Sequence, residues 1–149
     1  MRFLDQRKIA YEPFFYDAAI HSAVAVAETL GVPPQQVYKT LVMLPERGRP
    51  LLVMVPGPSE VEPKRLAKSL GIKSVEMAPQ REAERLTGLV VGGIGALALL
   101  NKPFDVLIEE EALAHDWVLV NGGKRGVNLK IAVADLVKVT NARAVDACP

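Results

Sequence analysis

Hydrophobic and polar positions along the chain change their period repeatedly, so that short helical and extended segments follow one another. Apolar residues spaced three and four apart predict helices over residues 2–9, 23–30, 63–70, 79–86 and 134–139. Runs of β-branched and other apolar residues predict strands over residues 12–16, 37–44, 51–55, 74–77, 89–91, 106–109, 117–120, 127–131 and 143–145. Many short strands with helices at irregular intervals favour a mixed α/β (α+β) fold. We expect one strongly curved, barrel-like β-sheet flanked by helices.

Turn and cap residues mark several boundaries of these segments. Ser22 is suited to cap the helix that begins at residue 23, and Gly31 is suited to end it. Residues 45–50 have turn chemistry, so the strands on either side of them are expected to form a hairpin. No repeat or long linker interrupts the sequence. A single domain over residues 1–149 is therefore expected.

Composition narrows the class of protein. The 149 residues are 50% hydrophobic and 23% charged with a net charge of +1, which is typical of a globular domain and not of a disordered chain. The sequence contains no apolar run of about 18 residues and no apolar stretch of a secretory signal near its start, which predicts a cytoplasmic protein without membrane contact. Cys148 is the single cysteine and there are two histidines, so neither a disulfide framework nor a Cys/His zinc site is expected.

Lys39 is the first candidate for chemistry. The period of two in residues 37–44 places Lys39 on the same face as Val37, Leu41 and Met43, in a strand that is apolar on both faces. One interpretation is a lysine whose ammonium reaches solvent at the end of the strand. The other is a lysine that points into a cleft, where it donates hydrogen bonds to a substrate phosphate or carbonyl.

A glycine-rich segment at residues 92–95 is the second candidate. A loop without side chains lets the backbone approach a ligand and offer N–H groups to an oxygen. The same segment fits the dinucleotide-binding pattern at Gly93, Gly95 and Ala98, with acidic residues at 109–111 for a ribose. That hypothesis is disfavoured because the pattern begins late in the chain and Pro103 shortens the helix that should follow. A tight turn required by packing is a further alternative.

Basic residues gather in two places. Lys64, Arg65 and Lys68 share one predicted helix, and Lys124 and Arg125 lie in the glycine-rich loop 121–126 between two predicted strands. Either group could be a solvated surface or a phosphate contact. The loop is no P-loop, since Val118 occupies the position where that motif requires glycine.

Standard nucleophile patterns are missing from the sequence. Neither His21, expected at the surface or next to a cap, nor His115 has an evident partner, and Cys148 is expected to be inert at a frayed terminus. An enzyme built from this chain would therefore work by positioning its substrate or water with Lys39 and backbone donors.

Three segments in order resemble the YbaK family of free-standing deacylases, which are similar to the editing insertion domain of bacterial prolyl-tRNA synthetase. The resemblance runs from about Tyr16 to Val145 and includes the basic helix and residues 74–78. The segments are Tyr38-Lys39-Thr40-Leu41-Val42, Thr87-Gly88-Leu89-Val90-Val91-Gly92-Gly93-Ile94 and Gly122-Gly123-Lys124-Arg125-Gly126.

The resemblance implies hydrolysis of the ester between a wrongly attached amino acid and the 3′ end of tRNA, most of all Cys-tRNA(Pro) and next Ala-tRNA(Pro). It implies that Lys39 is the catalytic residue and anchors the terminal adenosine, without metal or cofactor, and that the substrate's own thiol assists cleavage in cysteine-specific members. Partners are the tRNA acceptor end and prolyl-tRNA synthetase. The substrate-binding set is Tyr16, Thr40, Thr87, Gly92, Gly93, Ile94, Gly95, Asn121, Gly122, Gly123 and Asn128. The tRNA-binding set is Lys64, Arg65, Lys68, Lys124 and Arg125.

The sequence departs from the family pattern at three places. Gly95-Ala96 stands where Ser-Pro often follows the Gly-Gly-Ile segment, which frees the backbone where the ester is expected. Asn121 replaces a frequent serine, and Asn128 replaces a small polar or acidic residue. The amino acid that is removed stays open for this reason. The alternative function is a module that binds aminoacyl-tRNA or a nucleotide without hydrolysing it.

Overall fold

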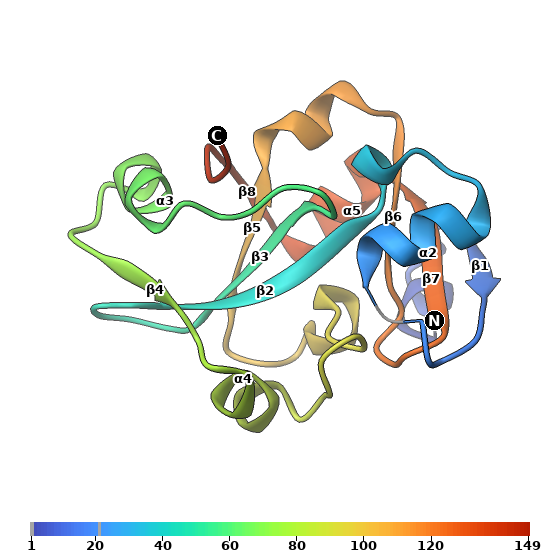
Figure 1. Ribbon diagram of the computed structural model, residues 1–149, viewed down its shortest axis with the longest axis horizontal. Coiled ribbons are helices and arrows are strands. Elements are labelled where there is room, and N and C mark those ends of the chain that lie inside the picture. The colour runs from blue at the N-terminus through green and yellow to red at the C-terminus, as the bar shows by residue number, and fades with distance from the viewer. Residues whose placement is uncertain (1, 21) are drawn as a thin grey trace.

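The strands form two separate sheets in the computed structural model, which describes residues 2–20 and 22–149 (Figure 1). The interpretation of His21 falls outside these residues. The smaller sheet is antiparallel, in the order β1 (Tyr11–Phe15), β7 (Val127–Ala132), β6 (Trp117–Asn121). The larger sheet is mixed, in the order β4 (Val75–Met77), β2 (Tyr38–Pro45), β3 (Leu51–Pro56), β5 (Asp105–Glu109), β8 (Arg143–Val145).

Helices flank the sheets and connect them. The α-helices are α1 (Arg2–Gln6), α2 (Ala23–Leu30), α3 (Pro63–Leu70), α4 (Gln80–Thr87) and α5 (Val133–Thr140). Shorter 3₁₀ turns are η1 (Pro34–Gln36), η2 (Ala96–Leu99) and η3 (Glu110–Ala114). As expected, Ser22 caps α2 by accepting a hydrogen bond from the Ala25 N–H, and Gly31 ends that helix in the left-handed conformation.

The mixed α/β class is confirmed, whereas the barrel-like sheet is wrong. Neither sheet closes on itself, and β6 approaches β2 in a single bridge between Val37 and Leu119. The predicted strand 89–91 is also absent, because those residues form a bend and a turn at the end of α4. Without that strand, and with a 3₁₀ turn in place of an α-helix after it, Gly93 and Gly95 have no dinucleotide-binding context.

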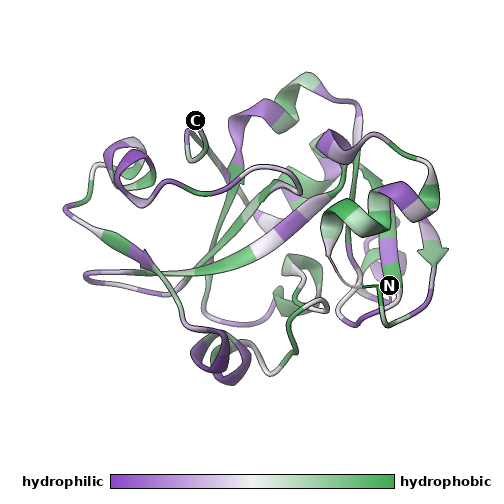
Figure 2. Cartoon of the chain, in the orientation of Figure 1, coloured by the Kyte–Doolittle hydropathy of each residue, from purple (hydrophilic) through white to green (hydrophobic). Residues whose placement is uncertain are grey.

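The larger sheet is buried on both faces. Leu52 and Met54 on one face of β3 pack with α5 and the smaller sheet, and Val53 and Val55 on the other face pack with α3 and the C-terminal segment. Figure 2 shows the result: β3 is hydrophobic, while α4 and the turn between β2 and β3 are hydrophilic. A strand with two buried faces reads as a continuous apolar run, which is why its element type was predictable.

The C-terminal segment is anchored, which corrects the expectation of a frayed end. Ala147 is fully buried and Cys148 is 8% exposed. Both residues donate their backbone N–H groups to Oε2 of the buried Glu109, at 2.7 and 3.1 Å. Burial raises the pKa of the Glu109 carboxyl, although these two N–H groups act in the opposite direction.

None of the helices in the described part of the chain has the length and apolar character needed to span a membrane.

Candidate functional site

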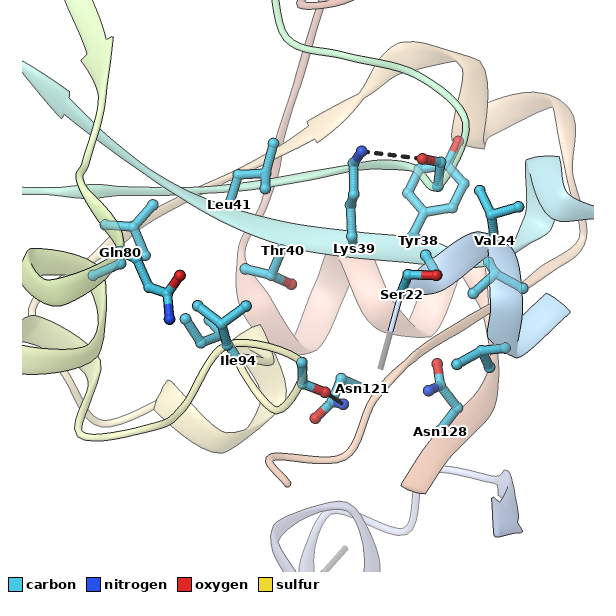
Figure 3. A pocket seen from close by; sticks show the side chains of 18 of the residues that line it. Ser22, Val24, Tyr38, Lys39, Thr40, Leu41, Gln80, Ile94, Asn121 and Asn128 are labelled. Carbon is cyan, nitrogen blue, oxygen red and sulfur yellow. Dashed lines mark hydrogen bonds between the residues drawn. The ribbon is translucent and has the colours of Figure 1, made fainter. Parts of the chain in front are cut away.

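A cavity of about 380 Å³ lies beside β2 and is the candidate site (Figure 3). Its walls come from β2, from α2 and from the start of α4. The loop after α4, the end of β6 and the start of β7 complete them. The lining residues are Tyr16, Ser22, Ala23, Val24, Val26, Val37, Tyr38, Lys39, Thr40, Leu41, Val42, Gly57, Met77, Ala78, Gln80, Ala83, Val91, Gly92, Ile94, Asn121 and Asn128.

The cavity follows an edge of β2 that no strand covers. β4 pairs with residues 43–45 of β2, and the bridge to β6 lies at Val37, so the described strands leave residues 39–42 open on this side. The Val37 carbonyl accepts from Gly57 N–H on the β3 side, whereas the Val42 carbonyl accepts from Ala78 N–H on the β4 side. Because backbone groups alternate along a strand, those of Thr40 point to the open side.

Lys39 extends from β2 into the upper part of this cavity in Figure 3. Its side chain is half-buried, and Nζ donates a hydrogen bond to the Gly57 carbonyl oxygen at 3.0 Å (dashed line in Figure 3). An ammonium group has three donors, so two remain for a ligand. Lys39 thus lies at the wall of the cavity, and its contact with a ligand stays a prediction.

Thr40 extends to the opposite side of β2, toward Ile94 and Asn121 (Figure 3). The glycine loop and Lys39 thus line one cavity from different sides, and Thr40 is the β2 side chain that lies toward the loop. A ligand that touches both Lys39 and Gly92 must pass the open edge of the strand. Its polar groups would meet the backbone of Thr40 on the way.

Asn121 fastens the glycine loop to the loop between β6 and β7. Its Nδ2 donates to the carbonyl oxygens of Gly92 at 2.8 Å and Lys124 at 3.2 Å, and its Oδ1 accepts from Gly123 N–H at 2.6 Å. The Gly92 carbonyl is therefore occupied by a protein donor. The turn is held in one conformation, with Gly92 at a φ of 89°, which favours glycine.

The remaining glycines of these loops serve the contact between the two backbones. A Cβ at Gly93 would lie 2.9 Å from the Arg125 nitrogen, and a Cβ at Gly95 would lie 2.5 Å from the Asn121 carbonyl oxygen. Arg125 adds a hydrogen bond from Nε to the Val91 carbonyl at 2.7 Å. Gly93 and Gly95 are therefore required by packing, which was the alternative interpretation of this segment.

Tyr16 and Asn128 close the end of the cavity near the smaller sheet. Asn128 is 4% exposed, and its Nδ2 donates to the Tyr16 hydroxyl at 2.6 Å. Burial raises the pKa of Tyr16, and the Asn128 hydrogen bond acts weakly against that rise. Both side chains are thereby fixed before any ligand arrives.

The predicted substrate-binding residues fall into two groups. Around the cavity the structure brings together Tyr16, Lys39, Thr40, Gly92, Ile94, Asn121 and Asn128. Outside its lining are Thr87, Gly93, Gly95, Gly122 and Gly123. Thr87 is buried at the end of α4, where its Oγ1 donates to the Ala83 carbonyl and accepts from Leu89 N–H.

The predicted tRNA-binding residues do not form one surface. α3, with Lys64, Arg65 and Lys68, lies at the opposite end of the molecule from the loop with Lys124 and Arg125 (Figure 1). Arg65 forms an ion pair with Asp146 at 2.9 Å, and Arg125 donates a hydrogen bond to the Val91 carbonyl. The exposed side chains of Lys64, Lys68 and Lys124 are accessible to a partner.

Several lining residues were missed by sequence reasoning. Ser22, Val24 and Val26 come from α2, which gave a helix signal without any sign that it faces β2. Met77 ends β4 and Gln80 begins α4, and no pattern in the sequence indicated that either lines the cavity. Tyr38 adjoins Lys39, and its buried hydroxyl has no hydrogen-bond partner among the described residues.

Burial favours the neutral forms of two acidic groups, Tyr38 in the lining and Cys148 outside it. Burial, together with the charges of Glu111 and Glu109, raises the pKa of Tyr38. Burial also raises the pKa of the Cys148 thiol to about 11, and Cys148 is outside the lining, so it supplies no thiolate nucleophile near neutral pH. Within residues 2–20 and 22–149 no group of three or more His, Cys, Asp or Glu side chains could hold a metal ion.

Fold and cavity together define a small α/β domain with one cavity lined by an ammonium group and by a fixed glycine turn. The chain belongs to the aminoacyl-tRNA editing domain family, whose family model matches residues 17–139. It is 34% identical, over 96% of its length and 88% of the relative's, to a protein of Enterococcus faecalis named "Putative Cys-tRNA(Pro)/Cys-tRNA(Cys) deacylase EbsC". This confirms the resemblance stated from the three sequence segments.

Longer relatives contain the domain as one part. The chain is 30% identical to a proline–tRNA ligase of Desulfotalea psychrophila over 84% of its own length, but it spans 22% of that ligase. Among solved structures, the "hypothetical protein APE2540" superposes with a TM-score of 0.90 at 24% identity, covering 99% of this chain and 97% of the other. The "putative trans-editing enzyme for prolyl tRNA synthetase" gives 0.82 at 23% identity, covering 98% and 92%. These two likenesses show the fold.

Proposed function

We propose that this protein is a trans-editing deacylase that hydrolyses the ester of mischarged tRNA, with Cys-tRNA(Pro) as its main substrate and Ala-tRNA(Pro) next. The observation that carries the proposal is the cavity along the open edge of β2, where Lys39 and the Gly92–Ile94 turn line one space. Family membership and the name of the E. faecalis relative support the same activity.

Lys39 is the residue that anchors the 3′-terminal nucleotide in this proposal. Its ammonium group is held by one carbonyl at 3.0 Å, and its remaining donors are free to meet a phosphate or ribose oxygen. A partly buried cation beside an apolar wall attracts an anionic group more strongly than an exposed one does, since less water screens the pair. The terminal phosphodiester is the anion closest to the reacting ester.

The aminoacyl ester is proposed to lie between Thr40 and the Gly92–Ile94 turn. Backbone N–H groups of a fixed turn stabilise the negative charge that develops on a carbonyl oxygen during ester cleavage, because they need no reorientation. The Gly93 N–H already donates to the Val90 carbonyl at 2.8 Å, so the N–H groups of Gly92 and Ile94 are the donors proposed for this charge. Asn121 keeps the Gly92 carbonyl engaged, so that this acceptor does not face the developing charge. The protein thus contributes position and electrostatics.

The nucleophile is proposed to come from outside the protein. In a cysteinyl ester the substrate's own thiol can attack its carbonyl carbon, while the 3′ oxygen of the tRNA leaves and takes up a proton. Water then opens the resulting thioester. This route requires a thiol one carbon from the α-carbon, so alanyl and seryl esters are expected to react more slowly and through water directly. No metal or cofactor takes part in the proposed reaction.

The partners follow from the substrate. The cavity admits the acceptor end of tRNA, and we propose that prolyl-tRNA synthetase, which contains a similar domain in D. psychrophila, supplies the choice of tRNA. The place of action is then the cytoplasm. A net charge of +1 gives the protein as a whole little long-range attraction to RNA, which fits this division of labour.

Deacylation of tRNA(Pro) charged with Cys, Ala, Ser or Pro tests the proposal. We expect the fastest release of Cys, slower release of Ala, and release of Pro no faster than in buffer alone. A chelator added to the same reactions is expected to leave every rate unchanged. Tight binding of Cys-tRNA(Pro) without release of Cys would instead establish the non-catalytic binding module.

A further inference from the structure

A second cavity, of about 540 Å³, lies at the far end of the larger sheet and is outside the site described above. It is formed by the turn between β2 and β3, the start of β5, the loop before β5, and the end of α5. Four cationic side chains line it, and these are Arg47, Arg49, Lys102 and Arg143. A single carboxylate, Asp105, lines it with them.

These cations are not neutralised within the protein. Arg47, Arg49 and Lys102 are exposed, and their side chains have no hydrogen-bond or ion-pair partner in the part of the chain that the structure describes. Arg143 donates to the Ser69 carbonyl at 3.3 Å, a neutral acceptor that leaves its charge in place. By contrast, Arg65 on α3 is paired with Asp146. Four like charges around one hollow repel one another, and a bound polyanion would remove that repulsion.

Partly buried apolar side chains form the less exposed part of the lining, which is called the floor here. Leu100 and Phe104 come from the loop before β5, and Leu70 is the last residue of α3. Ile72, two residues beyond, is 37% exposed. Cations at the rim and apolar side chains at the floor match a sugar-phosphate chain, whose phosphates face outward while its riboses and base faces make apolar contacts. A free phosphate ion would contact the cations but not the apolar side chains.

The two cavities are joined by one strand. Lys39 lines the first cavity and Pro45 lines the second, six residues further along β2, which corresponds to about 20 Å. An acceptor arm whose terminal nucleoside lies beside Lys39 continues well beyond this distance. From the shared strand, the uncovered positive charge and the apolar floor, we infer that the second cavity binds the phosphate backbone of RNA, namely the acceptor arm of the tRNA being edited. This inference rests on the proposed function.

Matched pairs of substitutions test the inference. Arg49→Gln with Lys102→Gln removes two cations from the hollow, and Arg2→Gln with Lys8→Gln, the control pair, removes two exposed cations that line neither cavity. Binding of uncharged tRNA(Pro) is measured at several salt concentrations. We expect the hollow pair to lower affinity about tenfold and to reduce the slope of log affinity against log salt by roughly 2, and the control pair to do neither.

Deacylation of two substrates gives a second readout. The hollow pair is expected to raise KM for Cys-tRNA(Pro) about tenfold with kcat unchanged, and to leave hydrolysis of a cysteinyl CCA trinucleotide as in wild type, because that substrate is too short to reach the hollow. Equal losses on both substrates would overturn the inference, as would unchanged tRNA binding or an equal effect of the control pair. Unchanged tRNA binding with loss of binding to prolyl-tRNA synthetase would also overturn it, in favour of a protein contact.

The two proposals fail separately. If wild type hydrolyses neither substrate, the proposed deacylase function fails, while the tRNA-binding measurements still decide whether the hollow binds RNA.

Discussion

The two cavities at the ends of β2 differ in how they use charge. The first contains one half-buried cation, Lys39, held by a carbonyl and surrounded by largely apolar walls. The second is lined by four exposed cations above an apolar floor. Buried charge is positioned by the protein and weakly screened, whereas exposed charge is strongly screened and adjustable. The first arrangement suits chemistry at one atom, and the second suits attraction along a chain of phosphates.

This comparison explains why the number of basic residues is a poor guide to the reaction site. The first cavity has the smaller charge, but it is where a rigid turn, an open strand edge and an ammonium group coincide. Substitutions in and around the two cavities test this difference, and we begin with the largest expected effect.

Replacement of Lys39 is expected to have the largest effect on activity. Lys39→Ala should lower kcat/KM for Cys-tRNA(Pro) by about 10²–10³, comparable to the loss of one preorganised donor in other enzymes. Lys39→Arg retains the charge but not the compact donor, and should recover part of that loss. Thermal unfolding of both variants should match wild type within a few degrees. Full activity of Lys39→Ala would show that the buried cation is not the anchor.

Asn121→Ala should loosen the Gly92–Ile94 turn, which lies on the Thr40 side of β2 (Figure 3). Two donors and one acceptor are lost, at Gly92, Lys124 and Gly123, so the free energy of unfolding is expected to fall by about 1–3 kcal/mol. The kcat on the cysteinyl trinucleotide should fall as well. Asn101→Ala is the control, since Asn101 is exposed and lies in a turn away from both loops. Unfolding by urea and steady-state kinetics measure the two effects.

Gly95→Ala should distort the same turn by overpacking. The added methyl group would lie 2.5 Å from the Asn121 carbonyl oxygen, so we expect a loss of about 1–3 kcal/mol in unfolding free energy and a higher KM. Binding of uncharged tRNA at the second cavity should change little. A variant as stable and as active as wild type would mean that the two loops are not packed as described.

Glu109 gives the smallest effect and a dependence on pH. Because its folded pKa is raised, the carboxyl stabilises the fold most when protonated, and this contribution is lost as pH rises from about 4 through the raised value. Glu109→Gln keeps an acceptor for the N–H groups of Ala147 and Cys148 without the charge.

The difference in unfolding free energy between Glu109→Gln and wild type should therefore grow in favour of the variant toward neutral pH, by up to about 1 kcal/mol. Glu109→Ala is the matched control. It leaves both N–H groups without an acceptor and should be destabilised by about 1–3 kcal/mol at every pH. A flat difference curve for the Gln variant would contradict the raised pKa.

Local patterns in the sequence predicted most elements and the position of Lys39. Alternation along residues 37–44 placed Lys39 correctly on the face of Leu41 and Met43, and the caps at Ser22 and Gly31 bounded α2. Residues 89–91 were mispredicted as a strand because three apolar residues resemble a buried strand, whereas Thr87 and Glu84 fix their backbone as a turn.

Contacts between distant segments could not be predicted. The division into two sheets depends on pairing of β1 with β7, and the cavity depends on α2 and α4 packing beside one edge of β2. The glycines at 93 and 95 are recognisable as a pattern in the sequence. The backbone contacts that require them come from residues 121–125, which no local pattern could indicate.

A crystal structure with a non-hydrolysable amide analogue of 3′-cysteinyl adenosine would show where the reacting ester binds. We expect the analogue to lie along the open edge of β2, with Lys39 Nζ within hydrogen-bond distance of its ribose or phosphate oxygen and its carbonyl at the Gly92–Ile94 turn. An analogue bound elsewhere, with the Lys39 cavity empty, would contradict it.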